Sequence, residues 1–507
     1  THGHRFEAAV DPVVLKDADS YAATLAKDGA VIASFAERKA EIAKQLASAA
    51  AKVGGGAKAI EDDALLDEVT ALVERPNVLV CEFEKEFLDV PQECLILTMK
   101  ANQKYFPLLD AANKLTNKFL VVSNISPADA SAVIGGNERV VRPRLADAKF
   151  FFDQDRKKTL ASRVEKLGAV VYHNKLGTQG ERAQRVRAIA ETIANRLDPH
   201  LVTNVQRAAE LAKTDLVTDM VGEFPELQGT MGRYYALNDG LGAEVADAIE
   251  DHYKPRFAGD ELPRNDVGLV VALADKLETL VGMFGIGNLP TGDKDPFALR
   301  RHALGVIRML VEKDLPLGLT ELVVGAAKVF GDKIQDASGA LVDFIYDRLA
   351  GSLRDEGYSA QEVDAVLAQR PQHLGDVGKR LAAVRAFAVL PEAPALAAAN
   401  KRVGNILKKA DGTVEAKVNE ALLAEPAERD LASALKSVAP QADAAWAAGN
   451  YTANLQALAA LKAPVDEFFD QVMVNAEDPA LRANRLGLLA TLHQAMNRVA
   501  DLSRLAS

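Results

Sequence analysis

Cysteine and long apolar runs are the features that this sequence has least of. Only two cysteines, Cys81 and Cys94, occur in 507 residues, which excludes a disulfide framework and a zinc site built from several cysteines. So low a cysteine content suits a reducing compartment, and we expect a cytoplasmic protein. No apolar run is long enough to cross a bilayer, so we do not expect a membrane function.

Positive charge is also in deficit. The formal net charge is -11, which excludes a protein coated in nucleic-acid-binding charge but is compatible with one local basic surface. Charged residues make up 26% of the chain and hydrophobic residues 49%, as in ordinary soluble globular proteins. A chain of 507 residues is longer than one hydrophobic core usually organises, so we expect three or four domains.

The first part of the chain has the pattern of a mixed α/β module. Val78 to Phe83 and Leu115 to Asn124 are rich in β-formers and predict strands, with an apolar helical run from Glu93 to Tyr105 between them. From Tyr172 onward the apolar residues recur at helical spacing. The predicted fold class is therefore multidomain and mainly α, with an N-terminal α/β module.

A basic and aromatic segment follows Gly135-Gly136. At these two glycines we expect regular secondary structure to be interrupted. Arg139, Arg142 and Arg144 precede the consecutive rings Phe150 to Phe152. Cations beside aromatic rings suit RNA, because phosphates attract the charges and unpaired bases stack on rings. Adjacent rings point in different directions around a helix, and we expect the first two of them to belong to the core.

The stretch from Val281 to Leu310 has the most unusual local sequence. We expect a glycine-rich loop that ends at Asp295-Pro296, an N-cap residue followed by proline at the first position of a helix. The glycines that indicate the loop are Gly282, Gly285, Gly287 and Gly292. The residues that then recur at helical spacing and predict a buried face are Leu299, Ala303, Val306, Ile307 and Leu310.

Lys294, Arg300 and Arg301 place positive charge beside this loop. A glycine-rich backbone leading into a helix N-terminus can hold a phosphate, although the spacing is neither that of a P-loop nor that of a dinucleotide site. The cations could form a recognition surface for RNA or a partner subunit. Alternatively, the arginines pair internally with Glu278 or Asp293, and the stretch is structural.

The last part of the chain begins with a candidate linker from Pro391 to Pro394. The segment from Ala399 to Lys409 then surrounds a short apolar core with cations. These candidate RNA-binding residues are Lys401, Arg402, Lys408 and Lys409. Asp478-Pro479 predicts the start of the last long helix.

Several long stretches, in the same order, resemble the beta subunit of the bacterial heterotetrameric glycyl-tRNA synthetase. The stretches that resemble it are Thr1 to Phe6, Gly136 to Phe152, Ala209 to Tyr235, His252 to Pro263, Ala274 to Gly282, Val281 to Leu310 and Val465 to Leu505. The chain begins inside one of these motifs without an initiator Met, and we expect it to lack the family's N-terminal segment.

The resemblance implies four domains and a division of labour between subunits. It implies a B3/B4-like α/β module at 1–155, an HD-type helical domain at 156–314, a helical linker or body domain at 315–394 and an all-helical anticodon-binding domain at 395–507. The alpha subunit is expected to use ATP and magnesium for glycine activation and transfer. This chain is expected to bind glycine tRNA, including its anticodon arm, with no cofactor and no complete catalytic site of its own.

An HD-type domain raises the question of a metal. The matching positions here are His173, Thr214-Asp215 and Asp275, and threonine stands where the paired histidine should be. Threonine cannot replace an imidazole as a neutral metal ligand, so we expect no catalytic metal. Two rival functions remain, an HD-type metal-dependent phosphohydrolase and a helical scaffold without an RNA role.

Overall fold

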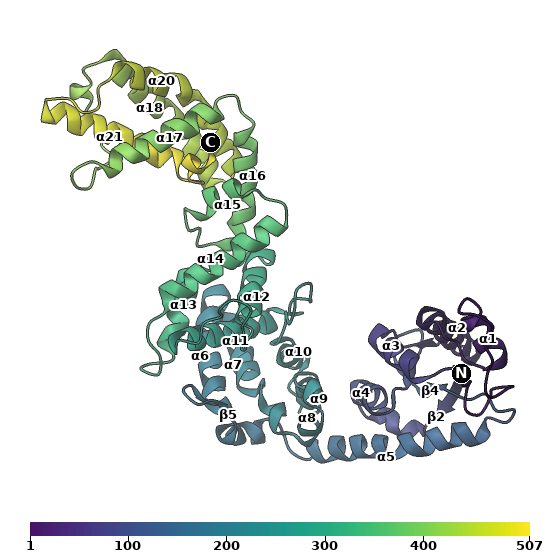
Figure 1. Ribbon diagram of the computed structural model, residues 1–507. Helices are drawn as coiled ribbons and strands as arrows, with labels where there is room; N and C mark the ends of the chain where they lie inside the picture. The colour runs from purple at the N-terminus through teal and green to yellow at the C-terminus, as the bar shows by residue number, and fades with distance from the viewer. Residues whose placement is uncertain (507) are drawn as a thin grey trace. The chain divides into compact units, whose positions relative to one another are not determined.

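The chain forms two compact units in the computed structural model, which describes residues 1–506 (Figure 1). The first unit consists of Thr1–Glu165 and Thr214–Gly242, and the second consists of Lys166–Lys213 and Ala243–Ser507. Ser507, the last residue of the predicted 395–507 domain, lies outside the described residues. The division into four domains stays a prediction.

The first unit joins a small sheet to helices. Its strands are β1 (Lys58–Ala59), β2 (Asn77–Glu82), β3 (Phe106–Leu109) and β4 (Leu115–Ser123). Its helices are α1 (Tyr21–Asp28), α2 (Phe35–Val53), α3 (Asp63–Leu72), α4 (Gln92–Gln103), α5 (Ser131–Asp155), α8 (Asp219–Glu223) and α9 (Thr230–Asn238). The predicted strands and the helix between them are confirmed as β2, β4 and α4.

The sheet is antiparallel, in the order β1-β3-β4-β2. Helices α2 and α3 pack against it, and Ile42, Leu46 and Val69 share one core with Phe106 and Leu120 of the strands. Their apolar residues recur at helical spacing on one face, which is the face that the sheet covers. An α/β module at the N-terminus is therefore confirmed.

Helix α5 runs through Gly135-Gly136 without a break. Its buried residues are Val141, Leu145, Ala148, Phe152 and Asp155. This spacing of three or four residues places Phe152 inside, where its ring stacks on Tyr235 with centroids 6.0 Å apart. The prediction that Phe150 and Phe151 form core is wrong, because Phe150 is 58% exposed and Phe151 only half-buried.

The second unit is helical apart from the two-stranded pair β5 (Val171–His173) and β6 (Gly177–Thr178). Its first helices are α6 (Gln179–Leu197), α7 (Val202–Leu211), α10 (Ala243–Asp251), α11 (Asp266–Gly285), α12 (Leu299–Glu312), α13 (Leu319–Lys328) and α14 (Ser338–Asp355). Its later helices are α15 (Ala360–Leu367), α16 (Val377–Ala388), α17 (Ala393–Lys408), α18 (Pro426–Ala447), α19 (Tyr451–Ala457), α20 (Lys462–Gln471) and α21 (Pro479–Met496). The mainly helical fold class is confirmed.

Helix α11 is the centre of the second unit. Every residue from Val267 to Gly285 is buried, and the helix contacts α6, α7, α10, α12, α13 and α14. A helix that is apolar on all sides is typical of the middle of a large core. Its few charged residues therefore need partners within the protein.

Those partners come from α6 and from Lys213. Glu278 accepts hydrogen bonds from Arg182 Nε at 2.9 Å and from Arg185 Nε at 3.0 Å. The Asp275 carboxylate lies 3.2 Å from the guanidinium of Arg182 and 3.4 Å from Lys213 Nζ. Burial alone would raise the pKa of Asp275, but Arg182 and Lys213 lower it well below its ordinary value.

The positions of the glycines before α12 differ from the prediction that all four lie in one loop. Gly282 and Gly285 belong to α11, where an added Cβ would lie 3.0 Å from Leu176 and 2.5 Å from Ile334 respectively. They allow close packing against neighbours, and only the later glycines, Gly287 and Gly292, lie in the loop with positive φ.

Helix α12 begins at Leu299 rather than at Pro296. The Asp295 carboxylate still caps it, because it accepts hydrogen bonds from the backbone N–H groups of Leu299 at 2.8 Å and Arg300 at 2.9 Å. The predicted buried face of this helix is confirmed, since each of its five residues is buried. The last long helix begins at Pro479 with Asp478 as its N-cap, as predicted.

Within residues 1–506, no single helix has both the length and the apolar composition of a membrane span. One bent pair, Leu374–Ala388 with Ala393–Lys408, meets these criteria only when the two helices are taken together across a 112° bend.

We expect Glu278→Gln to lower the free energy of unfolding by about 3–5 kcal/mol, because Arg182 and Arg185 would lose a buried anion. Urea denaturation measures this loss. The matched control is Glu312→Gln, which removes a half-exposed pair with Arg308 and should lower stability by less than about 1 kcal/mol. Equal losses in the two variants would show that the buried cluster does not hold α6 against α11.

Stability should also fall in mild acid because of His252. Burial lowers the pKa of His252 to about 3, and the Lys213 cation acts in the same direction. The unfolded chain takes up this proton below about pH 6.5, whereas the folded chain resists it down to about pH 3, so the folded state is progressively destabilised across that window. His252→Asn should flatten the decline measured by denaturation between pH 7 and pH 5, and the exposed control His200→Asn should not.

Candidate nucleic-acid interface

Helix α17 presents positive charge on its exposed side. Its buried residues are Ala393, Leu396, Ala397, Asn400 and Val403. Lys401, Arg402 and Lys408 lie away from that face and are exposed, as is Lys409 at the C-cap. The cations predicted at this helix are therefore on the surface, where a large polyanion could reach them.

These cations are not neutralised by nearby carboxylates. Within residues 1–506, the side chains of Lys401, Lys408 and Lys409 make no ion pair or hydrogen bond. The Arg402 guanidinium lies over the ring of Phe469 at 4.2 Å, a contact that positions the side chain and leaves its charge intact. By contrast, Lys462 and Arg498 in the same region pair with Asp466 and Asp443.

The surface around these cations is hollowed. A depression of about 410 Å³ is lined by Lys401, Arg402 and Lys409 together with Asn405. A larger pocket of about 600 Å³ lies between α17 and the end of α21, and Lys401 and Lys408 are among the residues that line it. Cations that line concave surfaces attract phosphate more strongly than cations on a flat face, because low-dielectric walls focus their field.

The second predicted basic segment lies on α5, in the first unit. Arg139 and Arg144 are exposed, whereas Arg142 donates to Glu84 at 2.6 Å. In the part of the chain that the structure describes, Arg139 and Arg144 have no ion-pair partner, and two such arginines on one helix offer an anion fewer cations than the α17 surface does.

The third predicted segment contains Lys294, Arg300 and Arg301. Lys294 and Arg301 are exposed, and Arg300 donates to the Gly292 carbonyl at 2.6 Å. The alternative of pairing with Glu278 or Asp293 does not occur within residues 1–506, because Glu278 is bound by α6 arginines and Asp293 makes no ion pair. Arg300 thus stabilises the loop itself, whereas the side chains of Lys294 and Arg301 make no ion pair within residues 1–506.

The positions suggested for a metal have other contacts. His173 accepts a hydrogen bond from Lys175 N at 3.1 Å and packs edge-on against Phe297. Asp215 accepts hydrogen bonds from the N–H groups of Gly229 and Gly232 at 2.6 and 3.0 Å. Across the described part of the chain, no three His, Cys, Asp or Glu side chains are grouped so that they could hold a metal ion.

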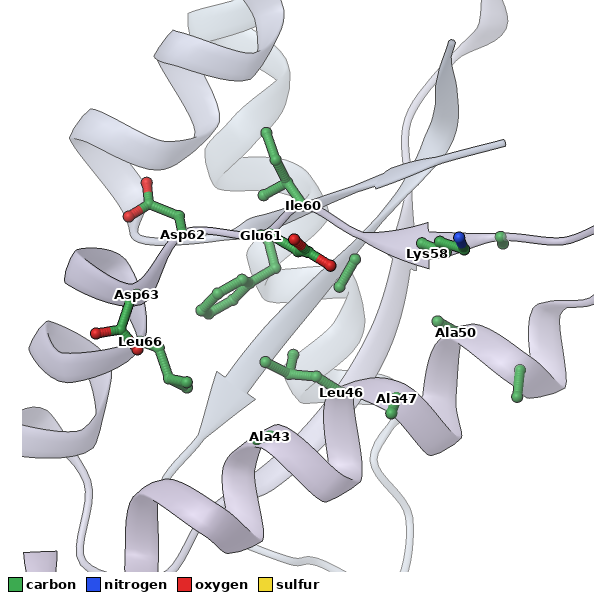
Figure 2. Close-up of a pocket in the computed structure, with 14 residues that line it drawn as sticks. Ala43, Leu46, Ala47, Ala50, Lys58, Ile60, Glu61, Asp62, Asp63 and Leu66 are labelled. Atoms are coloured by element: carbon green, nitrogen blue, oxygen red, sulfur yellow. The ribbon is translucent and has the colours of Figure 1, made fainter. Parts of the chain in front are cut away.

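A separate pocket of about 540 Å³ lies in the first unit between α2, β1 and the start of α3. Figure 2 shows alanines of α2 along one side and the acidic residues Asp62 and Asp63 near its rim. Asp62 pairs with Lys100 at 2.5 Å and Asp63 with Lys39 at 2.8 Å. The hydrogen bond from Lys100 lowers the pKa of Asp62, so this carboxylate is held ionised and is poorly suited to act as a general acid.

Residues 1–368 match the family model of the glycyl-tRNA synthetase beta subunit. The chain belongs to this family. Residues 396–502 match the model of the DALR anticodon binding domain, and this segment contains α17 and its cations. The match places the unpaired positive surface in a nucleic-acid-binding domain of a glycyl-tRNA synthetase beta subunit.

Individual relatives support the same family. The chain is 80% identical to the glycine–tRNA ligase beta subunit of Delftia acidovorans, over all of this chain and 72% of the relative. It is 79% identical to that of Polaromonas naphthalenivorans and 77% identical to that of Paracidovorax citrulli, over all of this chain and 71% and 72% of those relatives.

Sequence reasoning identified the α17 cations but missed the residues around them. Phe469, which contacts Arg402, and His493 and Asn497 at the end of α21, which line the 600 Å³ pocket, lie far from α17 in the sequence. No local pattern signals such contacts, because they depend on how the family's C-terminal helices pack.

We expect Lys408→Glu to weaken RNA binding and to lower the slope of log affinity against log salt by roughly one unit or less. Filter binding at several salt concentrations measures both quantities. Lys328→Glu is the matched control, since Lys328 is also exposed, also ends its helix and lies outside the DALR match. Equal effects of the two changes would mean that general charge, rather than the α17 surface, attracts RNA.

Proposed function

We propose that this chain binds glycine tRNA through its C-terminal helical domain and, with an alpha subunit, forms glycine–tRNA ligase. The observation that carries the proposal is the unpaired cationic surface of α17 within the segment that matches an anticodon-binding domain. A net acidic protein that gathers several uncompensated cations on one helix offers RNA a local binding surface, while its overall negative charge disfavours non-specific RNA binding.

Catalysis is assigned to the assembly rather than to this chain alone. ATP and magnesium are expected at the alpha subunit, where glycine is activated and transferred. The role proposed for this chain is to hold the tRNA in position. Positioning a substrate contributes to rate because it replaces a bimolecular encounter by a prearranged one.

The three other domain assignments, including the helical linker or body domain at 315–394, are proposed on resemblance. Residues 1–155 would form a B3/B4-like module, which agrees with the antiparallel sheet and its covering helices. Residues 156–314 would belong to an HD-type helical domain without a catalytic metal. The bonding of Asp215 to backbone N–H groups and of Asp275 to Arg182 and Lys213 supports structural roles for both.

The rival phosphohydrolase has less support. It would need a metal over a phosphate, whereas the Asp275 carboxylate is already neutralised by protein cations. A scaffold without an RNA role does not account for four unpaired or solvent-facing cations gathered at α17.

The test is reconstitution with the alpha subunit and a glycine tRNA. We expect Lys401→Glu combined with Lys408→Glu to raise the KM for tRNA in charging assays, with glycine-dependent exchange between ATP and pyrophosphate unchanged. The surface acts on tRNA, and the exchange reaction requires none. Unchanged charging, or failure of the wild-type chain to be retained by the alpha subunit, would contradict the proposal.

A further inference from the structure

A cavity separate from the α17 surface lies among the other helices of the DALR segment. Its volume is about 320 Å³, within the range of roughly 300–1,000 Å³ that is typical of small-molecule sites. Residues of α18, α19 and the later part of α21 line it, together with residues from the segment 416–420. It is therefore built from elements that are brought together only by the packing of this domain.

The walls of this cavity are mostly apolar. The apolar residues that carry the argument are Ala432, Leu435, Ala439 and Ala442 of α18 and Leu488 and Ala495 of α21. Those of α18 are spaced three or four residues apart and so share one face of the helix. Because most of these side chains are alanine, they leave space between α18 and α21. A dry apolar cavity of roughly 150 Å³ is already large enough to bind benzene, so this one can hold a two-ring molecule.

The charged residues of the wall neutralise one another. Lys436 pairs with Glu420, and Arg498 lies 2.7 Å from the Asp443 carboxylate. These two ion pairs account for all four charged side chains among the lining residues. The cavity therefore offers no net charge to a ligand, which favours a neutral molecule over an anion or a cation.

Asn454 of α19 is a deeply buried polar residue of the wall, with 1% of its surface exposed. Its Nδ2 donates a hydrogen bond to the Ala442 carbonyl at 2.8 Å, and this bond fixes the orientation of the amide. Within residues 1–506, Asn454 Oδ1 has no hydrogen-bond partner. A buried acceptor without a donor costs free energy, so an N–H or O–H group that enters the cavity and reaches this oxygen is favoured.

We propose that this cavity binds a small neutral molecule that has a compact apolar body and one N–H or O–H group. The apolar body fills the space between α18 and α21, and the polar hydrogen is donated to Asn454 Oδ1. The inference goes beyond the proposed function and does not depend on it, because it assigns the DALR segment a small-molecule site in addition to its RNA surface.

The first measurement compares two probes of nearly the same shape. Indole has two fused rings and one N–H donor, whereas benzothiophene has the same outline with sulfur in place of the N–H group. We expect isothermal titration calorimetry of the full chain to show one indole bound per chain. Benzothiophene should bind roughly five- to ten-fold more weakly, because it leaves Asn454 Oδ1 without a donor.

The second measurement locates the site by filling it. Ala495 is half-buried, lies in the last turn of α21 and lines the cavity. Ala495→Leu places a larger side chain in the space and should weaken indole binding by roughly ten-fold or more, and leucine is a good helix former, so α21 should remain folded. The matched control is Ala483→Leu in the same helix, at an exposed position that is not among the lining residues. It should bind indole as wild type does, and thermal melting verifies the fold of both variants.

A third variant distinguishes the two acceptors of the wall. Thr491 Oγ1 donates to the Gly487 carbonyl at 2.9 Å, so the hydroxyl of Thr491 can also accept a hydrogen bond from a ligand. Thr491→Val removes this acceptor with little change of shape. We expect the variant to keep the preference for indole over benzothiophene, because the donor is bound by Asn454. Loss of the preference would assign the contact to Thr491 and overturn the role of Asn454.

The remaining outcomes each contradict the inference in a different way. If indole does not bind wild type, the cavity holds solvent only and the site does not exist. If indole and benzothiophene bind equally, the cavity takes apolar molecules without regard to a donor, and the assigned ligand class is wrong. If Ala495→Leu binds indole as tightly as Ala483→Leu does, indole binds elsewhere on the protein and the assignment to this cavity is wrong.

Discussion

The buried ion cluster between α6 and α11 is the constraint on which the second unit depends. Helix α11 is enclosed along its length, and Glu278 within it is completely buried. A charge in that position is tolerated only with matched partners at short distance, and Arg182 and Arg185 supply them. Apolar packing alone would allow α6 to slide or rotate along α11, whereas these directional bonds fix one register.

Within residues 1–506, other cations of the same protein have no ion-pair partner. Buried carboxylates of the second unit are compensated at the α6–α11 contact, but the lysines of α17 face solvent. In a chain of net charge -11, carboxylates are abundant and could have neutralised them. Within residues 1–506, Lys401, Lys408 and Lys409 nevertheless make no ion pair, and together with the concave surface there they give the α17 part of the DALR segment local positive charge.

Much of this could be predicted from the sequence. Helical spacing identified the buried face of α12, β-formers marked β2 and β4, and Asp478-Pro479 located the start of α21, because each signal lies within a few residues of the element it specifies. The long family motifs identified the family, and the run of cations at α17 indicated the candidate site. The exposure of these cations could also be predicted from nearby residues, because the apolar residues of α17 recur at helical spacing and determine which side of the helix is buried.

Only the tertiary structure determined which residues of these elements are buried and which other elements they contact. It placed Phe152 rather than Phe150 in the core and put Gly282 and Gly285 inside α11, where neighbouring side chains leave no room for a Cβ. It also joined α17 to α21 through Asn400 and Asn497 and thereby formed the pocket. The sequence by itself determined periodicity, caps, family and the position of charge, all of which depend on neighbours along the chain. Pairing partners and cavities depend on residues far apart in sequence, so they exist only once the helices have packed.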